Sequence, residues 1–480
     1  MRDPGRVVVL GAGPTGLGAA YRLHELGVES FTVLEARQHP GGLASSYVDS
    51  RGFVWDVGGH VQFSHYGDYD AVLDRALEKH AWLEHRRESW VWIDGRFVPY
   101  PFQYNLHRLG AADRERALAG LERAAAARGQ TAAKDFRAWI LDTFGEGLAE
   151  VFLFPYNAKV WGYPLDTLGV GWMGEKVAAP DLERVRRNLR RGGDDVSWGP
   201  NARFRFPLRG GTGAIWGNVA GLIPGERLRY GAEVVRVELD ERRVALRDGR
   251  RIPYDALVTS APLDRLCDLC GDLAAADRRA AAELVHSSCH VLGVGLRGGR
   301  PASLRGKCWI YFPEAHSPYY RVTVFSNYSP HHVPPQDGVP PGDGYWSLMA
   351  EVCETPLRPV DAGRLRSQTL EAMARDGLVP EDAEVVSFWH RREEHGYPTP
   401  FLGRDRVLGR LLPSLERRGV YSRGRFVAWK YEVSNQDHSF MQGVEVVDRL
   451  LGRGDEPTLN RPDEVHRGAY RKLAERSVAR

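Results

Sequence analysis

Hydrophobic positions at the start of the chain follow first a strand pattern and then a helix pattern. The apolar run VVVL occupies residues 7–10, and in GLGAAYRLHELG, residues 16–27, apolar side chains recur every three to four positions. A second apolar run, FTVLE, occupies residues 31–35. Short continuous apolar runs are typical of buried parallel strands, and the three-to-four spacing is typical of an amphipathic helix. We therefore predict a β-α-β unit within about residues 1–65.

The middle of the chain changes from strand patterns to helix patterns and back. Residues 86–103 predict a β-hairpin whose turn is Asp94-Gly95, because this dipeptide favours tight hairpin turns. Helical spacing of apolar residues extends over most of residues 110–195. Residues 203–223 predict a strand, a glycine-rich turn and a helix.

The second half of the chain is mainly strand-like. Residues 227–262 predict a run of strands that ends in DALVTSAP, a return to the first sheet. Several stretches within residues 290–400 alternate with period two and predict a mainly antiparallel sheet. Residues 424–451 predict a strand, a loop and a helix.

Glycines at the end of the first strand form a dinucleotide-binding fingerprint. Gly11, Gly13 and Gly16 give the spacing G-x-G-x-x-G between the strand and the helix, which begins near Pro14. The first glycine permits a tight turn, the second lets the backbone approach a pyrophosphate, and the third lets helix and strand pack closely. Glu35, 22 positions after Gly13, ends the next strand and is placed to bind a ribose hydroxyl. The backbone amides at the start of this helix can donate hydrogen bonds to the phosphates.

Two further glycine pairs favour FAD over NAD. Gly41-Gly42 and Gly58-Gly59 follow the fingerprint, and glycine pairs let a backbone pass close to a flat ligand. A flavin needs a second place where the backbone comes close to it, because its ring system extends beyond the pyrophosphate. The helix after SNQDHSF is placed to direct its N-terminus at the flavin, where negative charge accumulates on reduction.

The predicted fold class is α/β, with a nucleotide-binding sheet assembled from separated segments. A helical insertion and a substrate sheet are threaded into this Rossmann-like core. The expected division is residues 1–85, 205–265 and 420–460 as the FAD-binding domain, 106–200 as the helical domain, and 86–105 with 285–400 as the antiparallel substrate domain.

Composition narrows the class of protein. A charge of +3 over 480 residues does not favour nucleic-acid or membrane binding. We find no apolar run of the ~18 residues that span a bilayer, and the chain enters its first strand directly, so we expect a cytoplasmic protein. Five cysteines are an odd and sparse set, which suits reduced thiols and not a disulfide framework. They include one C-x-x-C, and no second pair or H-x-x-H follows it at the spacing of a zinc site. The pair Cys267 and Cys270 is expected to be structural.

Blocks along nearly the whole chain resemble one family. GGLASSY, DVGGHVQFSHY, VPYPFQYN, PYNAKVWGYP, NARFRFPLRGGTG, YYRVTVFSNYSP, HGYPTPF and WKYEVSNQDHSF occur in the order of the eukaryotic-type UDP-galactopyranose mutases. The resemblance implies a nucleotide-sugar substrate and ring interconversion without net redox change. N5 of reduced FAD would be the nucleophile at the anomeric carbon. It also implies NADPH or NADH as reductant, and a homo-oligomer is compatible with it.

The resemblance also implies roles for individual residues. Arg321 would grip the diphosphate with its forked guanidinium, and His60 would act beside the flavin as a base or through a backbone flip. The resemblance matches three tyrosines to family residues that donate hydrogen bonds to the diphosphate: Tyr311, Tyr397 and Tyr431. The nucleotide and sugar positions are Tyr100, Phe102, Gln103, Tyr156, Asn157, Trp161 and Asn201. Flavin positions besides the fingerprint are Thr15, Gly42, Leu43, Gly59, Val234, Arg425, Asn435, Gln436 and Ser439.

One position departs from the family pattern. Lys176 stands in GEKVAAP where the family usually has an arginine of the diphosphate site. Lysine keeps the charge and loses the fork. Another nucleotide sugar, such as GDP-galactose, therefore stays open beside UDP-galactose. A flavin amine-oxidase-like oxidoreductase is the alternative of another class.

Overall fold

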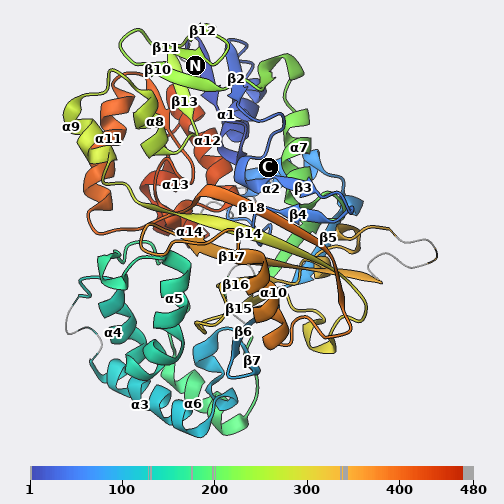
Figure 1. The fold of residues 1–480 in the computed structure, drawn as a ribbon. Coiled ribbons are helices and arrows are strands. Elements are labelled where there is room, and N and C mark those ends of the chain that lie inside the picture. Colours follow the sequence, from blue (N-terminus) through green and yellow to red (C-terminus); the bar gives the residue numbers. More distant parts are fainter. Residues whose placement is uncertain are drawn as a thin grey trace, which may run out of the picture.

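The fold combines a parallel sheet, a long antiparallel sheet and a helical region (Figure 1). The protein is seen in a computed structural model that describes residues 3–127, 129, 132–173, 177–196, 199, 202–335, 338 and 344–468. The parallel sheet lies at one end, the antiparallel sheet crosses the middle and the helices fill the other end. This mixed α/β architecture confirms the predicted fold class.

The parallel sheet collects strands from the whole length of the chain. Its order is β19-β13-β1-β2-β9, and all neighbours are parallel. Its members are β1 (Val7–Leu10), β2 (Phe31–Glu35), β9 (Leu228–Tyr230), β13 (Ala256–Thr259) and β19 (Val420–Ser422). The predicted return of DALVTSAP to the first sheet is confirmed, since Val7 pairs with Ala256.

Alternation along β1 divides the side chains between two apolar layers. Val7 and Val9 pack on one face against helices, and Val8 and Leu10 pack on the other face. The first layer includes α1 (Pro14–Glu25), α2 (Gly67–Ala76), α7 (Gly211–Gly221) and α12 (Gln436–Leu450). The second includes α8 (Leu263–Leu269), α9 (Ala275–Ala281), α11 (Arg404–Glu416) and the meander β10 (Val234–Glu238), β11 (Arg243–Leu246) and β12 (Arg251–Pro253). Every strand residue of β1 is therefore buried, as its unbroken apolar run predicts.

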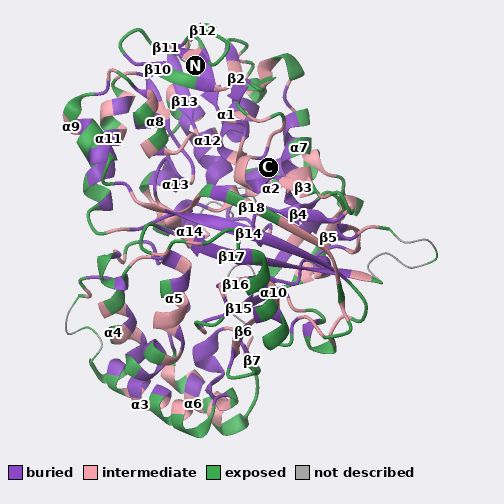
Figure 2. Ribbon diagram, in the orientation of Figure 1, coloured by how far each residue is buried: buried purple, intermediate pink, exposed green. Residues whose placement is uncertain are grey.

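The antiparallel sheet has seven strands in the order β18-β14-β17-β16-β15-β6-β7. They are β6 (Ser89–Ile93), β7 (Arg96–Pro99), β14 (His286–Arg297), β15 (Trp309–Tyr311), β16 (Arg321–Thr323), β17 (Tyr345–Glu354) and β18 (Glu384–Pro398). Only β15 and β6 run parallel. Figure 2 shows β14 and β17 as largely buried, with α10 (Leu365–Arg375) packed beside the sheet.

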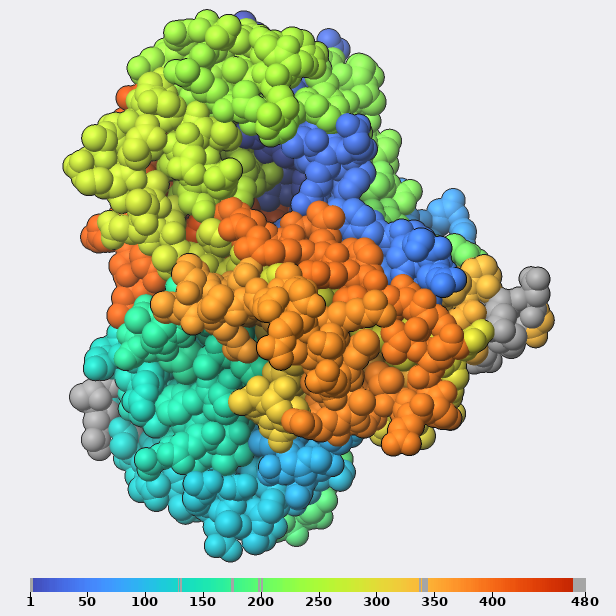
Figure 3. Space-filling model, viewed as in Figure 1, coloured from blue at the N-terminus to red at the C-terminus, as the bar shows by residue number. Residues whose placement is uncertain are grey.

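The helical region contains α3 (Ala111–Ala127), α4 (Phe136–Leu148), a π-helical turn (Ala149–Leu153), α5 (Phe154–Trp161) and α6 (Leu182–Arg191). Residues of α10 and β18 lie between this region and the parallel-sheet end in the space-filling view (Figure 3). Smaller elements are the pairs β3 (Ser46–Val48) with β4 (Val54–Asp56) and β5 (Trp82–Arg86) with β8 (Arg203–Pro207), and helices α13 (Pro457–Asn460) and α14 (Pro462–His466). Across the described ranges, no helix is long and apolar enough to cross a membrane.

The prediction of a strand at the start of residues 424–451 is wrong. The strand β19 ends at Ser422, and the following residues form a turn and then a 3-10 helix, Tyr431–Val433. Phe426 and Trp429 are buried in the core beside β19, and Trp429 has a φ of 49°. Consecutive buried residues resemble a strand in sequence, but here they fold into a core-filling turn.

Candidate functional site

A cavity of about 790 Å³ lies where the parallel sheet, the antiparallel sheet and the helical region meet. Most predicted cofactor positions line it: Gly11, Gly13, Thr15, Glu35, Gly42, Leu43, Gly59, His60, Val234, Arg425, Asn435, Gln436 and Ser439. Predicted substrate and catalytic positions that line it are Tyr100, Tyr156, Asn157, Trp161, Tyr311, Arg321, Tyr397 and Tyr431. Segments separated by several hundred residues therefore contribute to one site.

Five predicted site residues are not seen in this lining. Gly16 packs behind it, within α1. Phe102 is buried and stacks on Phe152 at 4.6 Å between ring centroids, and Gln103 donates a hydrogen bond of 2.5 Å to the carbonyl of Ala178. These two side chains support the wall from behind. Lys176 and Asn201 lie outside the described residues.

Local geometry requires glycine at two of the three fingerprint positions, Gly11 and Gly16. Gly11 has a φ of 98°, in the region that favours glycine. A Cβ on Gly16 would lie 1.8 Å from the carbonyl oxygen of Gly11, so the third glycine sets the close packing of α1 on β1. A Cβ on Gly13 would lie 3.8 Å from the Cα of Gly42, which places the two glycine segments side by side. Their bare backbones form a cradle that fits a pyrophosphate at the start of α1.

Glu35 stands at the end of β2 with both carboxylate oxygens oriented by the backbone. The amide of Ala12 donates to Oε2 at 2.7 Å, and the amide of Arg37 donates to Oε1 at 2.8 Å. The side chain is 8% exposed and lines the cavity. Each oxygen keeps a further lone pair, which suits a ribose hydroxyl donor.

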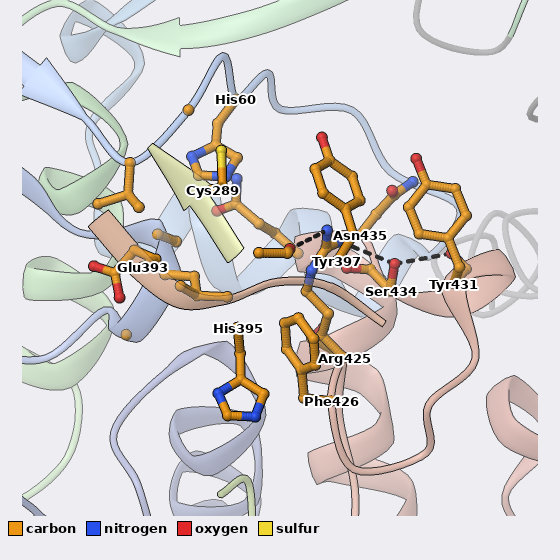
Figure 4. Close-up of a pocket in the computed structure, with 18 of the residues that line it drawn as sticks. His60, Cys289, Glu393, His395, Tyr397, Arg425, Phe426, Tyr431, Ser434 and Asn435 are labelled. Atoms are coloured by element: carbon orange, nitrogen blue, oxygen red, sulfur yellow. Dashed lines mark hydrogen bonds between the residues drawn. The ribbon is translucent and has the colours of Figure 1, made fainter. Parts of the chain in front are cut away.

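The other end of the cofactor path is built by α12 and Arg425. Asn435 is the N-cap of α12 and makes no side-chain capping bond, and it lines the cavity together with Gln436 and Ser439 from the first turn of the helix. Arg425 donates to the hydroxyl of Ser434 at 3.0 Å and to the carbonyl of Gly396 at 3.0 Å. Its guanidinium lies 4.9 Å from the ring centroid of Tyr397 (Figure 4). The guanidinium of Arg425 and the positive end of the α12 dipole fit a reduced flavin, which carries negative charge.

The Gly58-Gly59-His60 loop brings a neutral histidine to the cavity. Nδ1 of His60 is buried, with no hydrogen-bond partner among the described residues. Burial lowers the pKa of His60 to about 4, and nearby Arg425 and Arg321 act in the same direction against the carboxylate of Glu351. Gly58 has a φ of 105°, in the region that favours glycine. An unpaired buried nitrogen beside the cofactor path is the atom expected to meet a bound ligand.

Arg321 is fixed in place by a buried carboxylate that the sequence analysis did not identify. Glu351 on β17 accepts bonds of 2.8 Å from both Nε and Nη2 of Arg321. The same carboxylate accepts from the amide of Gly59 at 3.0 Å and from the hydroxyl of Tyr320 at 2.8 Å. Burial opposes both charges, but their attraction outweighs it, raising the pKa of Arg321 and lowering that of Glu351. The planar fork is thereby held in one orientation.

Tyrosine rings surround the space beside Arg321. Tyr397 and Tyr431 lie 5.7 Å apart between centroids, and Tyr311 contacts Tyr100 at 5.4 Å and Tyr156 at 5.3 Å. Burial raises the pKa of all five phenols, so each keeps its proton and can donate a hydrogen bond. Together with the guanidinium, they form a group of donors suited to an anion.

Trp161 and Asn157 extend this wall from α5. The indole nitrogen of Trp161 is buried and has no hydrogen-bond partner among the residues described, and its ring lies 5.2 Å from that of Tyr431. The side-chain nitrogen of Asn157 donates to the carbonyl of Leu153 at 2.8 Å, and its side-chain oxygen takes no part in that bond. Both residues line the cavity and offer polar groups to a ligand.

Several charged residues of the cavity lining were not identified in the sequence, and Glu351 and Arg87 are two of them. Glu351 lies within an apolar strand, YWSLMAEVCE, and an isolated acid in a buried strand is a signal that could have identified it. Arg87 lines the cavity with its guanidinium 5.9 Å from the ring of Trp309. It follows Arg86 in a polar stretch, so no pattern distinguishes it from a surface arginine.

Comparisons with known proteins agree with this geometry. The family model of flavin-containing amine oxidoreductases matches residues 14–451. A crystal structure of reduced UDP-galactopyranose mutase is 44% identical, with a TM-score of 0.92, and the match covers 96% of this chain and 97% of that one. A protoporphyrinogen oxidase-like structure from Exiguobacterium sp. 255-15 is 14% identical with a TM-score of 0.68 over 93% of this chain and 99% of that one, which shows the fold alone.

Curated relatives match over short segments. Mitochondrial protoporphyrinogen oxidase of Nicotiana tabacum is 41% identical over 69 residues, which is 14% of this chain. A possible lysine-specific histone demethylase 1 of Drosophila melanogaster is 36% identical over 73 residues, 15% of this chain. The matched segments span 13% and 8% of the length of these two relatives. By its nearly full-length match at 44% identity, the chain belongs to the UDP-galactopyranose mutase family, an isomerase family within the flavin-containing amine oxidoreductases.

Proposed function

We propose that the protein interconverts the pyranose and furanose forms of a nucleotide-activated hexose, with UDP-galactose as the first candidate. The observation that carries the proposal is the set of donors around Arg321. Its fork, held by Glu351, and the phenols of Tyr311, Tyr397 and Tyr431 converge on one space beside His60. Such donors suit a diphosphate, which departs with negative charge and must return.

Each residue then has a role that follows from its geometry. Arg321 binds the diphosphate and stabilises its charge when the bond to the sugar breaks. The tyrosines donate hydrogen bonds to the same group and keep it close for the return step. Tyr156 and Tyr100 offer aromatic faces to the base, where stacking contributes about 1–3 kcal/mol with little base selectivity.

The cofactor path ends beside this space, at His60 and Arg425. Reduced FAD, when bound, would supply N5 as the nucleophile toward the anomeric carbon without net redox change. His60 is neutral at physiological pH, and its buried Nδ1, which has no partner among the described residues, would be available to the bound cofactor. We propose that NADPH or NADH reduces the flavin from the same cavity. The G-x-G-x-x-G spacing recurs at Gly293, Gly295 and Gly298, but Gly293 and Gly295 lie inside strand β14 and not in a turn between a strand and a helix.

The test is anaerobic incubation of the dithionite-reduced protein with UDP-galactose and, separately, GDP-galactose, with the products resolved by HPLC. We expect interconversion from either ring form, and none with the oxidised protein. The two rates would identify the nucleotide, which Lys176 leaves open. Absence of interconversion with both, together with catalytic reoxidation of the flavin by another substrate, would replace this proposal with an amine-oxidase-like activity.

A further inference from the structure

Lys159 is a buried lysine on α5 that faces away from the cavity. Its side chain is 5% exposed. Nζ donates to the carbonyl of Glu314 at 2.9 Å and to the hydroxyl of Ser317 at 2.9 Å. Among the described residues, no carboxylate oxygen lies within ion-pair distance of it. A buried ammonium held only by neutral oxygens is unusual and needs a reason.

The loop that accepts these bonds connects two residues of the proposed diphosphate site. It begins after Tyr311, the last residue of β15, and ends at Arg321, the first residue of β16. Ser317 is buried, and its hydroxyl also bonds to the carbonyl of Glu314 at 3.2 Å, so the loop is folded around the lysine. The lysine is thus a direct polar link between α5 and the segment that joins the diphosphate residues.

The contact between α5 and this loop also includes aromatic rings, which face the cavity. Tyr156, three residues before Lys159, contacts Tyr311 at 5.3 Å between centroids. A further hydrogen bond holds the end of α5, where the hydroxyl of Thr355 donates to the carbonyl of Gly162 at 2.8 Å. Tyr156 and Tyr311 therefore touch on the cavity side of this contact, and Lys159 stabilises the same contact on the side away from the cavity.

We propose that Lys159 is a positioning residue for nucleotide-sugar binding, which latches α5 to the loop after β15 and so sets Tyr156 and Asn157 at the correct distance from Tyr311 and Arg321. The inference rests on the proposed function, since it assumes that these residues bind the nucleotide and its diphosphate. Positioning matters because displacements of about 1 Å in a binding wall reduce rates strongly.

The charge of the latch is sensitive to pH. Burial lowers the pKa of Lys159 to about 7, and Arg358, from the turn after β17, acts in the same direction. Asp376, at the end of α10, and Glu314, in the loop, oppose the shift. Both carboxylates also contact the ring of His316 in the same loop, at 2.7 and 3.5 Å. A charged ammonium donates stronger hydrogen bonds than a neutral amine. The hydrogen bonds that Lys159 donates to the loop should therefore be stronger below about pH 7 and weaker above it.

The experiment measures binding of UDP-galactose to the oxidised holoenzyme by calorimetry at pH 6 and pH 8, with KM and kcat of the reduced enzyme. We expect Lys159→Met to raise Kd and KM about 10-fold at pH 6, to leave kcat within about twofold and to remove the wild-type rise of Kd with pH. Lys159→Arg should restore part of the affinity. Lys307→Met is the matched control, because Lys307 is a half-buried lysine whose Nζ lies 3.6 Å from the ring centroid of Trp90 and which does not line the cavity.

Each outcome decides the proposal. An unchanged Kd in a folded, flavin-loaded Lys159→Met variant overturns it. If that variant does not fold, Ser317→Ala replaces it: this change removes one acceptor, and an affinity equal to wild type likewise overturns the latch. If the wild type itself binds neither UDP-galactose nor GDP-galactose, the proposed function fails, and this inference fails with it.

Discussion

Substitution of Gly16 by alanine tests whether contact between β1 and α1 builds the cofactor site. The new Cβ would lie 1.8 Å from the carbonyl oxygen of Gly11 and 2.9 Å from its carbon, whereas ordinary contacts begin at 3.4 Å. Both obstacles are backbone atoms, so α1 would have to move by more than about 1 Å. Overpacking of this kind destabilises by about 3 kcal/mol or more, which exceeds the gain of about 1 kcal/mol from the helix propensity of alanine.

The assay measures the ratio of bound flavin to protein and the thermal unfolding temperature, with and without added FAD. Gly16→Ala should lower both and weaken FAD binding at least about tenfold, since 1.4 kcal/mol is a factor of ten. The matched control is Gly217→Ala, an exposed position within α7 whose Cβ would meet nothing within 4 Å. It should be neutral or stabilise by about 0.5–1 kcal/mol. Full flavin content and a wild-type unfolding temperature in Gly16→Ala would refute the reasoning.

Three further predictions follow from single side chains. Arg321→Lys keeps the charge and loses the fork, so kcat/KM of the reduced enzyme should fall about 100-fold; a loss under threefold would contradict the assigned role. Glu351→Gln leaves Arg321 without its buried carboxylate and should reduce the free energy of unfolding in urea by about 3 kcal/mol, while an unchanged midpoint would show that the pair is not needed. Burial raises the pKa of Glu445 from 4.5 to about 8. The folded state therefore keeps a proton that the unfolded state loses between these values, and stability from this group falls by up to about 1.4 kcal/mol per pH unit as pH rises from 4.5 to 8. Glu445→Gln should flatten the stability profile in that window, and an unaltered slope would argue against the shift.

Local patterns were sufficient to predict the β-α-β unit and the glycine turn beside the cavity. Such a turn depends on backbone conformation within a few residues, and the spacing of Gly11, Gly13 and Gly16 records it directly. The prediction failed in residues 424–433, where Phe426 and Trp429 are as apolar as a strand but fill the core as a turn. Burial alone does not distinguish these two structures.

The substrate half depended on the family resemblance, because single tyrosines carry no local signal. Tyr311, Tyr397 and Tyr431 come from three distant segments, and their common space arises only when β15, the end of β18 and the turn before α12 are brought together. Phe102 and Gln103 are buried next to the cavity wall, on Phe152 and on the carbonyl of Ala178, and their role at the nucleotide stays a prediction.

By itself, then, the sequence determined the β-α-β unit, its glycine turn and the unbroken apolar run that buries both faces of β1. These properties follow from steric and hydrophobic preferences between neighbours in the chain. Only the tertiary structure decided that Glu351 orients Arg321, that Arg87 enters the cavity and that Lys159 joins α5 to the loop after β15. Their roles depend on contacts between residues far apart in the sequence, where the partner and the loss of water, not the residue type, set charge and orientation.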